Sequence, residues 1–277
     1  MPLIFAAFTG AGYLAADAWR MSMFIPGAAL FIMAFLYYFF TSDSPHGNKG
    51  TGIGTSKTEM PPKESFLSVC SDHRVWILFL AYGACFGIEI TIDNIATLYF
   101  TDTFHLNLQE AGIIAGLFGM MNLFARALGG IFGDRAGKKY GLKGRMLVLA
   151  TFLLLEAIGI VVFASVDLLG WAIVTMLVFA LFLKMANGAT YAVVPFINTR
   201  SVGIISGIVG AGGNVGAVLA GFLFASNPHS YRESFVIIGT AVAAVSCLAF
   251  VMSLWKKRNE QELKTRSDTP FLRKSVA

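Results

Sequence analysis

The stretch SVGIISGIVGAGGNVGAVLAG, residues 201–221, points to the fold class, because it holds seven glycines, no charged residue and the single amide of Asn214. Glycine costs about 1 kcal/mol relative to alanine inside a helix, so this segment needs close approach of another backbone. Gly212 and Gly216 lie four residues apart, on one helix face, which favours tight helix packing in a membrane. A nucleotide-binding loop is disfavoured, because no strand, turn signal or later ribose-binding acid frames the glycines.

The composition of the whole chain also indicates a membrane protein. Of its 277 residues, 56% are hydrophobic and only 13% are charged, which is too apolar for one soluble core. Several segments are long enough to cross about 30 Å of hydrocarbon as helices, and period-two alternation is absent. The seven predicted spans cover residues 21–41, 75–100, 111–132, 146–165, 171–196, 202–224 and 234–254. We therefore predict an all-α polytopic membrane protein.

The basic residues are explained by membrane topology. The net charge is +5, but the lysines and arginines gather in short loops beside the spans, so a nucleic-acid partner is not expected. They crowd residues 135–145 and follow the last span at 256–258, which places both segments and the C-terminus in the cytoplasm. The three cysteines are scattered without metal-ligand or pairing intervals, and we expect no metal and no cofactor.

The order of spans and polar stretches predicts the domain organisation. We expect residues 1–20 to be the remnant of a preceding helix with an external loop marked by Asp17 and Arg20. Residues 21–41 would be the last helix of an N-terminal bundle, and 42–74 a flexible cytoplasmic linker. Residues 75–255 would form a C-terminal six-helix bundle, and 256–277 a mobile cytoplasmic tail. On this basis we expect a fragment, or a gene model opened at an internal methionine, that would not transport alone.

Arg126 lies well inside the third span. Burying an arginine there costs at least about 2.5 to 3.5 kcal/mol, so it must face protein or a water-filled cavity. Its guanidinium is permanently charged and presents a planar fork of donors that suits a small planar oxyanion. The alternative is an internal ion pair with an acid on another helix.

Glu89 lies in the second span, deeper than Asp93, with which it shares a helix face. A carboxylate embedded in a membrane can carry a proton or pair with a cation. We select Glu89 as the proton-coupling candidate. The sequence leaves a purely structural pair with Lys184 equally open, and Glu156 in the fourth span complicates the assignment.

Three further groups of residues are candidates. Asn187 belongs to a polar cluster that either lines a pathway or makes interhelical hydrogen bonds. Tyr82 and Phe86, four residues apart, could form a wall of a site, although such aromatics are more often core. Asp134 and Arg135, at the cytoplasmic mouth, are candidates for gating, with a simple topogenic loop as the alternative.

Five stretches carry a resemblance to a known family. The loop GDRAGKK, 133–139, resembles the repeated signature of the major facilitator superfamily. GIVGAGGNVGAVLAG, 207–221, resembles the C-terminal signature of its nitrate/nitrite porter family. AYGACFGIEITIDN (81–94), AGIIAGLFGMMNLFARALGG (111–130) and NGATYAVVPF (187–196) are similar, in matching order, to the eukaryotic high-affinity nitrate transporters of plants and algae.

The resemblance implies that the spans correspond to helices six to twelve of a twelve-helix transporter. It implies that Arg126 contacts nitrate, that Asn187 matches a tenth-helix position, and that a partner arginine lies on a helix this chain lacks. It also implies that Asn214 approaches the anion together with Gly212, Gly213 and Gly216. The implied mechanism is alternating access between two bundles.

The expected function is secondary active transport of nitrate or nitrite. Moving an anion into a cell that is negative inside costs about 2.3 kcal/mol per 100 mV, so proton-coupled symport with more than one proton is expected. Nitrate/nitrite exchange is the close alternative. Transport of another small anion or metabolite, or a non-transporting sensor or partner subunit, are the rivals. An enzyme is not expected, because no nucleophile with a base and no cofactor loop emerges. The expected partners are nitrate or nitrite, protons, the lipid bilayer and an accessory membrane subunit, with the plasma membrane as location.

Overall fold

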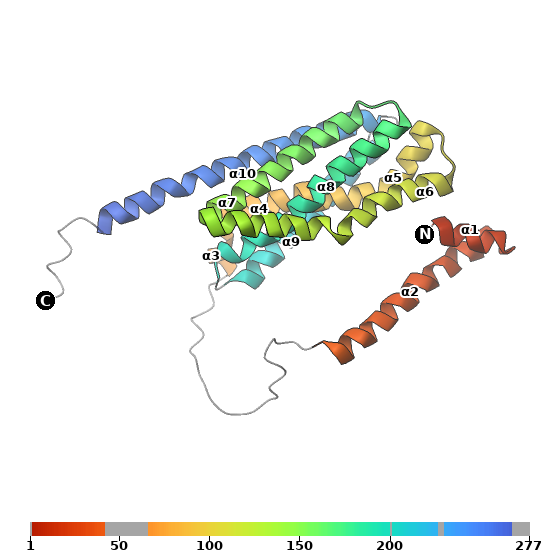
Figure 1. The fold of residues 1–277 in the computed structure, drawn as a ribbon, viewed down its shortest axis with the longest axis horizontal. Coiled ribbons are helices and arrows are strands. Elements are labelled where there is room, and N and C mark those ends of the chain that lie inside the picture. Colours follow the sequence, from red (N-terminus) through yellow and green to blue (C-terminus); the bar gives the residue numbers. More distant parts are fainter. Residues whose placement is uncertain (1, 42–65, 200, 227–229, 268–277) are drawn as a thin grey trace.

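In the computed structural model of the 277-residue chain, the described residues are 2–41, 66–199, 201–226 and 230–267, with side chains described as far as residue 254. Within these ranges every regular element is a helix. The helices from α3 onward form a bundle, and α2 lies apart from it (Figure 1). This arrangement confirms the predicted all-α fold.

The N-terminal part consists of two helices. α1 spans Pro2–Gly10 and α2 spans Ala15–Phe40. The predicted external loop around Asp17 and Arg20 was wrong, since both residues lie in α2, 3.9 Å apart. An acidic residue in the first turn is favourable because it faces the positive end of the helix dipole. The predicted flexible linker falls mostly at 42–65, outside the described residues, and its end forms the short helix α3, Phe66–Cys70.

The first span of the bundle contains a local change of helical pitch. It is built from α4 (His73–Tyr82), the π-helical turn η1 (Gly83–Gly87) and α5 (Ile88–Phe104). Asp72 caps α4 by accepting a hydrogen bond from the Arg74 backbone N–H at 2.9 Å. Partial burial raises the pKa of Asp72, but hydrogen bonds and the charge of Arg74 outweigh it, so the net pKa is lowered. Single π-turns inside α-helices occur often at functional sites.

The next helical stretch contains two predicted spans. α6 (Leu108–Met120) leads through a 3₁₀ turn, η2 (Met121–Leu123), into α7 (Ala125–Ala164). Gly141 has φ 61° and ψ −147° inside α7, a backbone conformation that side-chain-bearing residues rarely adopt. A Cβ added to Gly144 would meet the carbonyl of Ala136, which shows that the chain doubles back at Gly141. The two halves of α7 therefore belong to successive spans.

Three further segments complete the bundle. α8 (Leu169–Val193) ends in a 3₁₀ turn, η3 (Val194–Phe196), and is followed by α9 (Val202–Ser226) and α10 (Tyr231–Ser267). Six helical stretches of the described chain are long and apolar enough to span a membrane, and Leu108–Ala164 is one of them. Because that stretch reverses at Gly141, the seven predicted crossings are all present as helices. α10 continues as a helix through the first part of the predicted tail.

The ends of the spans lie in two groups. In Figure 1, α3 and the reversal inside α7 lie at one end of the bundle, whereas the connection from α5 to α6 lies at the other. The long α10 packs along α7, where Ser246 Oγ donates to the carbonyl of Ala150 at 2.8 Å. The end with the α7 reversal carries the basic loop 135–145.

Candidate functional site

Two breaks in regular helix position the charged residues of the bundle. The π-turn η1 ends at Gly87, shortly before Glu89, and the 3₁₀ turn η2 ends at Leu123, shortly before Arg126. At η2 the backbone of Phe124 turns to φ −131° and ψ −30° before α7 starts at Ala125. Arg126 therefore lies in the first turn of a helix that begins within a membrane span, where N–H groups lack partners inside the helix.

Glu89 is the centre of a buried hydrogen-bond cluster. Its Oε1 accepts from Asn122 Nδ2 at 2.7 Å and from Lys184 Nζ at 2.9 Å. Its Oε2 accepts from Arg126 at 2.8 Å and from the side-chain amide of Asn187. Arg126 Nε also donates to Asn122 Oδ1 at 3.1 Å. We call these five residues the Glu89 cluster. It joins α5, η2, α7 and α8.

The Glu89 cluster carries an excess of positive charge. Two cations, Arg126 and Lys184, face one carboxylate, so the hydrogen-bonded groups sum to one positive charge. Lys184 is completely buried, while the side chain of Arg126 is 39% exposed. Asp93, on the same helix as Glu89, is exposed and acts on the cluster only through its charge. Arg126 is therefore the cation of the cluster that an external anion can reach.

An aromatic wall adjoins Arg126. The guanidinium carbon lies 5.3 Å from the centre of the Phe86 ring, and Phe86 stacks on Tyr82 at 4.9 Å with an interplanar angle of 12°. Tyr191 meets Tyr82 edge-on at 5.1 Å. A Cβ added to Gly213 would lie 2.6 Å from the Phe86 ring, so glycine at this position leaves room for the rings. Four of the predicted site residues, Arg126, Phe86, Tyr82 and Gly213, thus lie together.

Two of the predicted glycines pack against backbone. A Cβ on Gly212 would collide with the carbonyl of Phe79, and a Cβ on Gly216 with that of Gly83. Such contacts are the close helix packing that small residues allow. The space beside these two glycines is therefore filled by the backbone of the first span, and their predicted place at the anion site stays a prediction.

Asn214 lies on the open side of α9. It is exposed, and its side chain makes no hydrogen bond to another residue in the described part of the chain. Gly210 lies one helical turn earlier, and a Cβ added to it would be 3.6 Å from the hydroxyl oxygen of Tyr191. Residues four apart share a helix face, so Asn214 lies on the same face of α9 as Gly210, the face near Tyr191. The structure does not bring it into contact with Arg126.

The predicted gating residue Asp134 pairs with an arginine that the sequence did not single out. Asp134 pairs with Arg145, and the predicted Arg135 is exposed. Arg145 is buried, donates to the carbonyl of Ala192 at 3.2 Å and lies 3.9 Å from the centre of the Phe196 ring. It therefore ties both halves of α7 to the end of α8. The reversal at Gly141, between Asp134 and Arg145, brings the two together.

A second missed residue is Asn122. It lies four residues before Arg126 in the sequence, which places both on one helix face if the helix is regular. This spacing was the available signal, since an isolated amide in an apolar span requires a partner.

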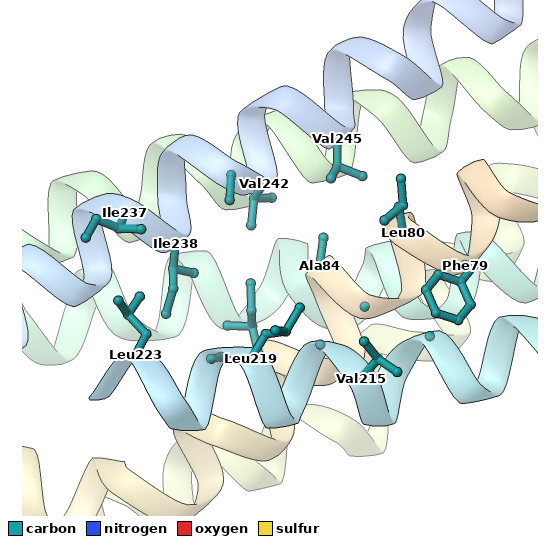
Figure 2. A pocket seen from close by; sticks show the side chains of 16 residues that line it. Phe79, Leu80, Ala84, Val215, Leu219, Leu223, Ile237, Ile238, Val242 and Val245 are labelled. Atoms are coloured by element: carbon teal, nitrogen blue, oxygen red, sulfur yellow. The ribbon is translucent and has the colours of Figure 1, made fainter. Parts of the chain in front are cut away.

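The cavity of about 420 Å³ between α4, α9 and α10 lies elsewhere in the bundle (Figure 2). Its lining includes Phe79, Leu80, Leu219, Leu223 and Val242, and contains no charged or amide side chain. An apolar surface of this kind offers no donor to an anion. The Glu89 cluster, and not this cavity, is the candidate functional site. In the described residues no group of three or more His, Cys, Asp or Glu side chains could hold a metal ion.

Known proteins similar to this chain are transporters. It is 40% identical over 251 residues to High affinity nitrate transporter 2.5 of Arabidopsis thaliana, covering 89% of this chain and 49% of that protein. It is 38% identical over 260 residues to High-affinity nitrate transporter 2.3 of Oryza sativa subsp. japonica, and the match covers 92% of this chain and 50% of that protein. It is 35% identical over 265 residues to Nitrate transporter 2.2 of Chlamydomonas reinhardtii, and the match covers 92% of this chain and 51% of that protein.

These comparisons agree with the resemblance read from the sequence motifs. The chain spans about half the length of the curated relatives it matches. The family profile of the Major Facilitator Superfamily matches residues 2–199, which include the helices that carry the Glu89 cluster. Together with the all-helical, multi-span structure, this match establishes that the chain belongs to the Major Facilitator Superfamily.

Proposed function

We propose that this chain forms part of a secondary transporter that carries nitrate, or nitrite, across a membrane by alternating access. The single observation that carries the proposal is the partly exposed Arg126 in a membrane-embedded cluster with one excess positive charge. The names of the relatives support nitrate as the substrate class.

The binding step follows from the geometry at Arg126. The guanidinium already gives one N–H to Glu89 and one to Asn122, and its remaining N–H groups can donate to a planar oxyanion. The Phe86 ring beside it excludes water from one side, which strengthens the charge-assisted hydrogen bond. Glu89 and Asn122 thus hold the arginine in place for the anion.

The role predicted for Glu89 as proton carrier remains a prediction. Its two oxygens accept four hydrogen bonds, two of them from cations. Such a carboxylate is stabilised in its charged form by its partners. This geometry supports the structural alternative, in which Glu89 holds Arg126 and Lys184 while another group exchanges protons.

Three further elements belong to the same proposal. The excess of basic residues at 135–145 supports a cytoplasmic location of that loop and of the C-terminus. The pair of Asp134 with Arg145 connects helices at this mouth and is proposed to open during alternating access. The plasma membrane, proton symport and an accessory membrane subunit complete the proposed assignment.

A current measurement tests the proposal. A transporter would be assembled from this chain and the part of the Arabidopsis relative that the chain does not cover, then expressed in oocytes. We expect nitrate-dependent current, and a loss of apparent nitrate affinity of about 10- to 100-fold in Arg126→Lys. Lysine retains the charge but lacks the planar fork of donors.

The matched control is Arg20→Lys, because the side chain of Arg20 is 76% exposed and lies outside the bundle. It should leave the current unchanged. Current evoked by chloride or a sugar and not by nitrate would refute the substrate assignment. Normal nitrate affinity in Arg126→Lys would refute the proposed binding site.

A further inference from the structure

Glu156 is a buried acid for which the site described above has no use. It lies on the second half of α7 and is completely buried. Neither of its carboxyl oxygens has a hydrogen-bond partner. Glu89, the other buried carboxyl, is saturated with donors, so the two acids have opposite surroundings.

The physical cost of these surroundings depends on the protonation state of Glu156. An ionised carboxylate taken out of water without a partner is far more costly than a neutral carboxylic acid. The titratable group that acts on Glu156 is Glu89, through its negative charge, and Glu156 in turn acts on the thiol of Cys85. The proximity of a like charge adds to the cost of ionisation.

The helices packed against this part of α7 offer no free cation. On α8 the charged residue is Lys184, whose ammonium donates to Glu89, and Tyr191 is the other titratable group. On α10, between Ser234 and Leu254, the titratable residue is Cys247, which is exposed. On α5, Asp93 is exposed and negative. In the described chain, therefore, no cation pairs directly with the Glu156 carboxyl.

We propose that Glu156 is a proton-binding site of the transporter, and that its proton couples to the anion through the charge of the Glu89 cluster. The inference rests on the proposed anion site at Arg126. With Glu156 neutral, the buried groups sum to one positive charge and favour a monovalent anion. With Glu156 ionised, the same groups sum to zero, and the anion loses its electrostatic attraction.

Glu156 carries one proton in each transport cycle, and the additional proton that makes the cycle electrogenic is carried elsewhere. The proton leaves the Glu156 carboxyl for water when the site opens to the side of lower proton concentration, and the anion then dissociates. On the other side the carboxyl takes a proton from water and the anion binds. Proton and anion thus bind with positive cooperativity, and linkage requires the effect to be reciprocal.

Infrared difference spectroscopy on the full chain in lipid nanodiscs tests the protonation state. At neutral pH the wild type should show the carbonyl stretch of a buried, protonated carboxylic acid. The band should disappear in Glu156→Gln and persist in Glu89→Gln and in the matched control Asp93→Asn. A wild type without this band, or a band that survives in Glu156→Gln, would overturn the inference.

The coupling is tested in the assembled transporter described above. Nitrate affinity in the wild type should fall as external pH rises, with a change in the range of about 5- to 150-fold that is usual for coupled sites. Glu156→Gln imitates the neutral acid, so it should bind nitrate at all pH values and take up fewer protons per nitrate than the wild type. Glu156→Asp should restore part of the pH dependence.

The two proposals fail in different ways. An unchanged number of protons taken up per nitrate in Glu156→Gln would refute Glu156 as a proton site and leave the anion site standing. A wild type without nitrate current would refute the transport function, and the proposed coupling with it.

Discussion

Replacing Lys184 by methionine measures how strongly the Glu89 cluster holds the bundle together. Lys184 is completely buried, and its Nζ donates to Glu89 Oε1 at 2.9 Å and lies 4.2 Å from the centre of the Phe118 ring. Methionine retains the unbranched apolar stem but removes the charge and the donor. The substitution leaves Glu89 with three of its four hydrogen bonds.

Removing one partner of a buried ion pair costs about 3 to 5 kcal/mol, because the other charge is left uncompensated. We expect Lys184→Met to lie near the lower end, at about 3 kcal/mol, because Arg126 still neutralises Glu89. In the double variant Lys184→Met with Glu89→Gln, the uncompensated carboxylate is also removed. Its free energy of unfolding should therefore be about 2 kcal/mol higher than the sum of the single effects predicts.

The assay is reversible unfolding of the chain in mixed micelles by titration with dodecyl sulfate, followed by circular dichroism. Lys138→Met is the matched control, since Lys138 is exposed and its loss should change stability by no more than about 0.5 kcal/mol. A Lys184→Met chain as stable as this control would contradict the reasoning. So would single costs that simply add in the double variant.

Two further substitutions test the packing and the helix cap. Gly216→Ala should lower the free energy of unfolding by about 1 to 3 kcal/mol, because its Cβ meets the backbone of Gly83. The control is Gly203→Ala, where an added Cβ has no neighbouring atom within 4 Å. In the same assay this control should be neutral or stabilising by up to about 1 kcal/mol. The pKa of Asp72 in the folded protein is lowered by Arg74 despite partial burial. The ionised carboxylate therefore stabilises the fold above the unfolded-state pKa of about 3.9, and this stabilisation is lost as pH falls through the lower folded-state pKa. Amides at the start of α4 should therefore exchange faster with solvent below about pH 4, after correction for intrinsic rates, and Asp72→Asn should abolish this pH dependence; equal slopes in both proteins would contradict it.

The spans and the charged site residues could be predicted because the membrane makes each polar residue conspicuous. Arg126 and Glu89 interrupt long apolar runs, and a charge at that depth requires a partner or a function. The sequence also left the Glu89 pair with Lys184 open, and the structure contains that pair at 2.9 Å. What one sequence cannot give is the distance between residues 95 positions apart.

The local breaks in the helices could not be predicted from sequence patterns. The π-turn at Gly83–Gly87 and the 3₁₀ turn at Met121–Leu123 contain no proline that would mark a break in the helix. The same holds for the Asp134–Arg145 pair, which depends on the reversal at Gly141. Tertiary contacts between helices determine such features, because helix propensity discriminates only weakly between the α, 3₁₀ and π patterns of backbone hydrogen bonds.

The contact between α9 and the first span of the bundle has a kinetic consequence. At Gly212 and Gly216 the α9 backbone lies directly on the backbone of Phe79 and Gly83, and no side chains interlock there. In ordinary helix packing, sliding requires interdigitated side chains to leave their rotamers and pass one another. A smooth glycine contact removes that obstacle. The glycines would therefore lower the barrier to sliding of α9 along α4, so that bulkier residues slow this movement even where the bundle tolerates them.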